Sequence, residues 1–413
     1  MRGTVSSRRS SGGWHDRQAT GPEQSTAPRI DPHFPFMNTR HQHETLAPAA
    51  WINAAWDRSA AKLRRTSRRI GDTFPHVSKN GRYDAAPVHW WTAGFWPGLL
   101  WLVYRETHDD ALRALAESCE RQLDRTIVEF DDLYHDVGFM WSLTAVARYK
   151  LLGADDSRRR SLLAASLLAS RFNLRGRFLR AWNEDRVGWA IIDSLMNLPI
   201  LYWASERLGD PRFKYIAMAH ADTALRHFVR DDGSCRHIVS FDPVTGDFIE
   251  ALGGQGESPD SAWSRGSAWA LYGFTLSYKY TGEVRYLEAA SRVAHFFVSH
   301  LPADLVPYWD FRAPVTAETP RDSSAGACAA SGLLELASLA PTPDAALFQN
   351  AAVALLRALD TQCGAWDADE EGLLRMGTGH VPEGQNINVS LIYGDYFFVE
   401  ALAKLRGQRE LFW

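Results

Sequence analysis

The sequence contains little cysteine, and this scarcity excludes two kinds of stabilised fold. Four cysteines occur in 413 residues, widely separated and with no CxxC pair. A disulfide framework needs a higher density of cysteine, and a zinc site needs clustered ligands or a motif such as HExxH, which is also missing. We therefore expect reduced thiols that pack as small apolar groups in a cytoplasmic protein, and no metal centre.

Long uncharged stretches are absent as well. No segment reaches the roughly 18 apolar residues that a membrane-spanning helix needs, and no apolar run follows Arg2 as it would in a secretory signal. Charge of one sign does not dominate, because 45 basic side chains are balanced by 49 acidic ones for a net charge of −4. We expect a soluble protein that is attracted neither to nucleic acid nor to a membrane surface.

The first 45 residues differ in composition from the rest of the chain. They are rich in Ser, Arg, Gly and Pro and show no apolar period, which is typical of disorder. We expect a disordered segment over 1–45, followed by a single catalytic domain over 46–413.

Helical periodicity recurs from residue 46 onward, in two alternating kinds of segment. One kind is charged and amphipathic, over about 47–70, 109–127, 156–172, 211–230, 284–300 and 344–361. The other kind is almost free of charge, over about 91–104, 137–147, 190–205, 263–278, 323–334 and 389–406. A helix that is apolar on all sides must be buried on all sides, and amphipathic helices can cover it. The alternation predicts an all-α fold, an (α/α)6 barrel with six inner and six outer helices.

An open helical solenoid is the alternative architecture. Such arrays repeat at a short fixed period near 34 residues, whereas the uncharged segments here begin about 45 to 70 residues apart. The variable spacing favours the closed barrel.

The unusual polar residues lie near the starts of the uncharged segments. Inner helices of a barrel run parallel, so their N-termini share one mouth, whose free N–H groups favour an anionic ligand. Asp193 follows the apolar residues 190–192, where an unpartnered carboxylate is costly, so catalysis competes with a structural hydrogen bond as its role. Asp136 is either functional or a helix cap, and Asp322 is more naturally a cap. Arg265 either forms an ion pair in the core or binds a substrate carboxylate through two hydrogen bonds.

This combination suggests acid–base chemistry on an acidic sugar. An apolar wall raises the pKa of a carboxyl group, so Asp193 could hold a proton near neutral pH while Asp136 stays ionised. Tryptophans would stack on the sugar ring, and Arg265 would bind the acidic group. His135 and His237 lack the spacing of metal ligands and are either site residues or bystanders.

Several segments resemble the unsaturated glucuronyl hydrolases of glycoside hydrolase family 88. They are WTAGFWPGLLW, HDVGFMW, IIDSLMNLPILYWA, GQGESPDSAWSRGSAWALYGF, RDSSAGACAASGLLEL and SLIYGDYFFVEAL, in that order, and the resemblance runs from about residue 46 to the C-terminus. It implies an (α/α)6 barrel, no metal and no cofactor, and a substrate with a 4,5-unsaturated uronic acid at its non-reducing end. Ordinary glycosidases act at the anomeric carbon. The family instead hydrates a vinyl ether: an Asp protonates C4, water adds at C5, the hemiketal opens and the aglycone leaves.

The resemblance also assigns roles to nine residues. Asp193 matches the family's acid/base, and Asp136 matches the second essential carboxylate, which orients the substrate. The residues that match the uronate subsite and its stacking surfaces are Trp91, His135, Trp182, His237, Gln255, Trp263 and Arg265. The expected partner is therefore an unsaturated oligosaccharide, and the oligomeric state stays open.

Three other functions compete with this one. Unsaturated rhamnogalacturonyl hydrolases have the same barrel and similar chemistry, and unsaturated disaccharides from chondroitin, heparin, ulvan and pectin would separate the two families. A sugar epimerase on this barrel would be expected to carry paired catalytic histidines on inner helices, which the sequence lacks. A non-catalytic helical scaffold would tolerate Asp193→Asn, whereas the hydrolase would not.

Overall fold

The computed structural model describes residues 48–413 except 130–131, 184 and 368. The chain divides into two units, Met1–Thr45 and Leu46–Trp413. The disorder expected over 1–45 lies outside the described residues.

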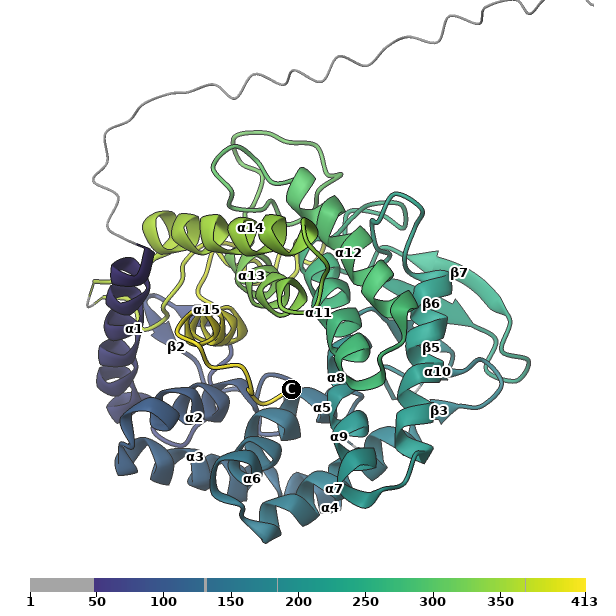
Figure 1. Cartoon of the computed structure of the whole chain (residues 1–413), viewed down its shortest axis with the longest axis horizontal. Helices are drawn as coiled ribbons and strands as arrows, with labels where there is room; N and C mark the ends of the chain where they lie inside the picture. Colours follow the sequence, from purple (N-terminus) through teal and green to yellow (C-terminus); the bar gives the residue numbers. More distant parts are fainter. Residues whose placement is uncertain (1–47, 130–131, 184, 368) are drawn as a thin grey trace, which may run out of the picture. The chain divides into compact units, whose positions relative to one another are not determined.

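Six helical runs form the inner ring of the second unit. They are α2 (Phe95–Thr107), α5 (Val137–Trp141) with the π-helical turn η1 (Ser142–Val146) and α6 (Ala147–Leu152), α8 (Ser194–Asn197) with α9 (Pro199–Leu208), α11 (Ser264–Thr281), α13 (Ser323–Ala337) and α15 (Ile392–Leu405). Neighbouring runs pack against each other in chain order, and α15 packs against α2, so the ring closes. Figure 1 shows α2, α11, α13 and α15 around the centre.

Six helices form the outer ring. They are α1 (Pro48–Ile70), α3 (Asp110–Leu123), α7 (Asp155–Ser170), α10 (Arg212–His227), α12 (Val284–Ser299) and α14 (Asp344–Ala358). Five of them follow their inner partner in the sequence, whereas the first packs against α15, the last inner helix. The short helix α4 (Thr126–Glu129) follows α3, and the π-helical turn η2 (Leu359–Cys363) extends α14. The predicted (α/α)6 barrel is confirmed (Figure 1).

The two kinds of helix differ in burial as the sequence predicted. All residues of α2 from Phe95 to Tyr104 are buried. The outer helix α3 instead buries one face, through Leu112, Ala116, Cys119 and Leu123, and this spacing is that of a single helical stripe.

Glycine allows the inner helices to approach one another closely. A Cβ at Gly273 of α11 would lie 2.5 Å from the Cβ of Leu195 in α8, and one at Gly332 of α13 would lie 2.5 Å from Leu271 in α11. A side chain at either position would therefore force the ring apart.

The apolar segment 190–205 does not form the single helix that its sequence predicts. Its start belongs to β5 (Trp189–Ile191), which pairs antiparallel with β6 (Ile238–Phe241), and β6 pairs with β7 (Phe248–Leu252). Two β-branched residues, Ile191 and Ile238, are partners in this ladder, and such side chains favour strands. The helix begins only at Ser194, and Pro199 starts a second helix because proline has no N–H to continue the first. Asp193 consequently lies at a strand-to-helix junction.

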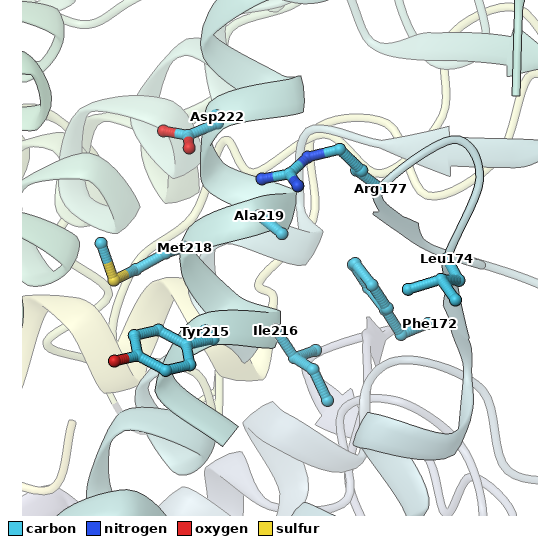
Figure 2. Close-up of a pocket in the computed structure, with 8 residues that line it drawn as sticks. All are labelled: Phe172, Leu174, Arg177, Tyr215, Ile216, Met218, Ala219 and Asp222. Carbon is cyan, nitrogen blue, oxygen red and sulfur yellow. The ribbon is translucent and has the colours of Figure 1, made fainter. Parts of the chain in front are cut away.

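The chain forms two further short hairpins between helices. They are formed by β1 (Ser78–Lys79) with β2 (Arg82–Tyr83) and by β3 (Phe172–Asn173) with β4 (Phe178–Leu179). Next to the second hairpin, a hollow of about 430 Å³ opens against α10 on the outer wall (Figure 2). Its lining includes Phe172, Arg177 and Tyr215 but none of the nine predicted site residues. No helix among the described residues combines the length and apolarity needed to cross a bilayer.

Candidate active site

The β5–β6 ladder brings Asp193 and His237 together. Ile191 ends β5 and pairs with Ile238, which begins β6. Asp193, which follows β5, and His237, which precedes β6, therefore lie at the same end of the ladder. The Nε2 atom of His237 lies 3.6 Å from Oδ2 of Asp193. Asp193 occupies the N-cap position of α8, yet its side chain caps nothing. Oδ2 of Asp193 has no hydrogen-bond partner among the described residues. A structural hydrogen bond at this atom therefore does not account for the presence of a carboxyl group here.

Burial changes the acid strength of Asp193. Loss of water contact and, to a smaller extent, the negative charge of Asp136 raise the pKa of its carboxyl group from the usual 3.8 to about 7, against the opposing effect of Arg265. The side chain keeps 15 % of its surface exposed, so a ligand or water can reach it. Asp193 can thus exist as a neutral acid near neutral pH, as predicted from its apolar surroundings.

His237 turns its Nε2 toward Asp193 without forming a hydrogen bond to it. Its Nδ1 accepts a hydrogen bond of 2.8 Å from the backbone N–H of Gln255, so in the neutral ring the proton is on Nε2, which faces Asp193. Burial lowers the pKa of His237 to about 3, so the ring is neutral at ordinary pH. The ring also packs against Trp263, with 4.5 Å between centroids.

A second pair, His135 and Asp136, lies at the start of α5. Nε2 of His135 is 3.4 Å from Oδ2 of Asp136, and its Nδ1 shares a 2.8 Å hydrogen bond with Oγ of Ser194. Asp136 does not cap its helix and instead accepts a 3.3 Å hydrogen bond from Nδ2 of Asn197. Burial raises the pKa of Asp136 to about 7, against smaller opposing effects of Asn197 and Arg171. The prediction that Asp136 stays ionised while Asp193 holds a proton is therefore wrong, because burial raises both pKa values to about 7. Through Ser194 and Asn197, the starts of α5 and α8 are joined at one mouth of the barrel.

Arg265 has more partners in the core than the sequence predicted. Its guanidinium forms an ion pair with Asp322 and donates to the carbonyl oxygens of Thr378 and Gly379 and to Oε1 of Gln255. These contacts match the core ion-pair interpretation, and the grip on a substrate carboxylate stays a prediction. Asp322 also caps α13, as expected, by accepting from two backbone N–H groups.

Aromatic rings line both sides of Arg265. The guanidinium carbon lies 4.6 Å from the ring centroid of Trp263 and 5.3 Å from that of Tyr393. Trp91 is partly buried 4.9 Å from Tyr393. The predicted residues Trp91, Gln255, Trp263 and Arg265 are thus connected to Asp193 through His237 and through shared ring contacts.

Trp182 belongs to the segment that contacts His135. It is partly buried beside Trp189, at 5.9 Å between ring centroids. Its neighbour Ala181 accepts a 3.2 Å hydrogen bond from the backbone N–H of His135, which ties the Trp182 segment to the His135–Asp136 pair.

Sequence reasoning missed Asn197, Ser194 and Tyr393. The signal for Asn197 was present, because it follows Asp193 by four residues and therefore lies on the same helix face. Among the residues that the structure describes, no cluster of three or more His, Cys, Asp or Glu side chains could hold a metal ion.

Comparison with known proteins identifies the family of this site. The sequence model of Glycosyl Hydrolase Family 88 matches residues 66–380. The unsaturated glucuronyl hydrolase of Bacillus sp. (strain GL1) is 39% identical over 84% of this chain and 95% of its own length. The unsaturated chondroitin disaccharide hydrolase of Streptococcus pyogenes serotype M1 is 34% identical over 88% of this chain and 93% of its own.

A solved structure gives the same result in three dimensions. The crystal structure of an unsaturated glucuronyl hydrolase from Bacillus sp. GL1 superposes with a TM-score of 0.84 at 37% identity, covering 86% of this chain and 97% of that one. Sequence and structure agree over nearly the whole of both chains, and we conclude that this protein is a glycoside hydrolase of family 88.

Proposed function

We propose that the protein removes a 4,5-unsaturated uronic acid from the non-reducing end of oligosaccharides produced by a polysaccharide lyase. The names of its relatives refer to unsaturated glucuronyl and unsaturated chondroitin disaccharide substrates. The observation that carries the proposal is the vacant Oδ2 of Asp193, a buried carboxyl group with a raised pKa and access to a ligand.

In this mechanism Asp193 is the proton donor. Its proton moves to C4 of the unsaturated ring, the C4–C5 double bond is lost, and positive charge develops at C5 and the ring oxygen. Water adds to C5 and its proton returns to the Asp193 carboxylate, so the acid is regenerated. The resulting hemiketal opens and the aglycone is released. A general acid of this kind typically contributes about 10²- to 10⁴-fold to the rate.

The other residues prepare this step. When Asp136 is ionised, its charge raises the pKa of Asp193 and so keeps the proton available. The Nε2–H of neutral His237 faces the carboxylate that remains after proton transfer and would stabilise it. The rings of Trp91, Trp182 and Trp263 would pack against the sugar, with Arg265 close to its carboxylate.

A panel of unsaturated disaccharides from chondroitin, heparin, ulvan and pectin tests the proposal. Turnover removes the conjugated double bond, so loss of its ultraviolet absorbance measures the reaction. We expect decay with at least one uronide, and no released sugar from its saturated counterpart when the products are separated by chromatography. Decay with the pectin disaccharide alone would instead support a rhamnogalacturonyl hydrolase, and no decay with any member would overturn the assignment.

We also propose that the domain over 46–413 carries the whole catalytic site and works in the cytoplasm without a metal or cofactor. All four cysteines are free and buried, as suits a reducing compartment. Measuring the activity of a chain that begins at Leu46, with and without a chelator, tests the first and last parts, and cell fractionation tests the location.

A further inference from the structure

Arg171 connects the outer ring to two segments that carry predicted site residues. It directly follows α7, and its three guanidinium nitrogens donate five hydrogen bonds. Four acceptors are backbone carbonyl oxygens, of Leu133 at 3.2 Å, Arg180 at 2.9 Å, Ala181 at 3.2 Å and Trp182 at 3.0 Å, and the fifth is Oδ1 of Asn183 at 2.8 Å. No carboxylate is among these acceptors, so the fork of the guanidinium is used to hold backbone in place.

The five acceptors belong to the two segments that meet beside Asp136. Leu133 lies two residues before His135, and the other four acceptors surround or belong to Trp182. The segments also bond each other directly, from the N–H of His135 to the carbonyl oxygen of Ala181 at 3.2 Å and from Asn183 to Leu133 at 3.3 Å. Arg171 therefore spans the junction between the carboxylate that orients the substrate and a predicted stacking ring.

The charge of Arg171 also reaches the site. Its presence lowers the pKa of Asp136 and of His135. The other titratable groups that influence this region are Asp193, whose pKa the charge of Asp136 raises, and Arg180 and Tyr134, which act on Arg171 itself. Burial lowers the pKa of Arg171 only to about 10, so it stays a cation over the working range of pH.

We propose that Arg171 is a positioning residue for the hydrolysis, which fixes Asp136 relative to Trp182 and supplies the cation that favours the ionised carboxylate. This inference rests on the proposed function. Arg171 would then affect both substrate binding and the protonation of Asp136. It would do so from the outer ring, through backbone and Asn183 contacts and through its charge.

Two substitutions separate the two parts of the role. Arg171→Lys keeps the charge but replaces the fork by a single ammonium, which cannot reach all five acceptors. We expect a fall in kcat/KM of about 10- to 100-fold with a raised KM, because small displacements of positioned groups have effects of this size, and an unchanged acid limb of the pH profile. Arg171→Met removes the charge as well, so the pKa of Asp136 rises and the acid limb moves to higher pH.

Lys150 provides the matched control. Its Nζ donates to the backbone carbonyl oxygens of Leu411, Phe412 and Trp413 at 2.9 to 3.1 Å. Lys150 lies near the end of the inner run formed by α5, η1 and α6, whereas Asp136 directly precedes its start. Lys150→Met should lower the melting temperature but leave KM and the pH profile of the folded enzyme as in the wild type.

The results separate the role of Arg171 from the proposed hydrolase activity. If the wild type hydrolyses an unsaturated uronide but folded Arg171→Met keeps its KM and acid limb, the positioning role is wrong and the function stands. If Arg171→Met does not fold, an unchanged KM in Arg171→Lys overturns the role in the same way. If the wild type itself is inactive on the whole panel, the proposed function fails, and the inference fails with it.

Discussion

Buried carboxyl groups at the two ends of the barrel have opposite surroundings. At the mouth, Oδ2 of Asp193 has no hydrogen-bond partner, and Nε2 of His237 lies 3.6 Å from it. At the other end, the fully buried Glu400 lies 3.9 Å from Lys404. It accepts hydrogen bonds of 2.6 to 2.8 Å from Tyr272, Ser331, Tyr396 and the indole N–H of Trp413. The C-terminus, marked in Figure 1, lies within the ring at this end.

A raised pKa does not distinguish the two kinds of carboxyl group. Burial raises the pKa of Asp395 to about 7, as it does for Asp193. Asp395, however, accepts hydrogen bonds from Tyr83 and from the backbone N–H groups of Leu373 and Leu374. A buried carboxyl group whose acceptors are filled holds the structure together, whereas one with a vacant oxygen can bind and react. On this basis we propose that Asp193 serves chemistry, and Glu400 and Asp395 the fold.

The largest expected effect is that of Asp193→Asn. The amide cannot supply the proton, so we expect kcat to fall by roughly 10³-fold or more, within or beyond the usual range for a lost general acid. Asp124→Asn is the matched control, because burial also raises the pKa of Asp124 to about 7 while it is bonded to Trp141 and paired with Arg160 in the outer ring. Equal losses of kcat in the two variants would show that the vacant oxygen of Asp193 does not mark a catalytic role.

Asp136→Asn should have the next largest effect. We expect a loss of about 10²-fold from the weaker orientation of the substrate. The substitution also removes the negative charge that raises the pKa of Asp193, so this pKa falls. The alkaline limb of the pH profile of the residual activity should therefore move to lower pH. A pH profile of kcat measures the shift, and an alkaline limb that stays in place would contradict the electrostatic link.

Glu400→Gln should affect stability instead of chemistry. The indole N–H of Trp413 and the hydroxyl groups around Glu400 all donate toward it, and an amide NH2 would place a donor against a donor. We expect a loss of about 3 kcal/mol in unfolding free energy, typical of a broken buried hydrogen bond to a charged group. Chemical denaturation measures the loss. Activity per folded molecule should be retained, and a selective loss of kcat would contradict the assignment.

The sequence predicted the barrel and the carboxylates but not how the site is held. Charge content separates inner from outer helices because burial on all sides excludes charge, so the ring could be inferred from composition alone. The strand at 189–191 could not, because a short apolar run fits a helix or a strand until its partner is known. The same holds for Arg265 and Arg171, because two acceptors of Arg265 and four of Arg171 are backbone oxygens, and no sequence pattern marks a carbonyl group as an acceptor.

The smallest expected effect is a pH-dependent change in stability on replacement of Asp193. The pKa of Asp193 is about 7 in the folded chain and 3.8 in its usual state, so the unfolded chain loses this proton first as the pH rises. Ionisation therefore favours unfolding, and the penalty begins near pH 4 and is complete above about pH 7. Asp193→Asn removes the penalty, so its melting temperature should exceed that of the wild type by more at about pH 8 than at about pH 5. Glu400→Gln should lower the melting temperature at both. An Asp193→Asn variant that melts below the wild type at pH 8 would show that this carboxyl group stabilises the fold after all, and the two ends of the barrel would then not differ in the way proposed.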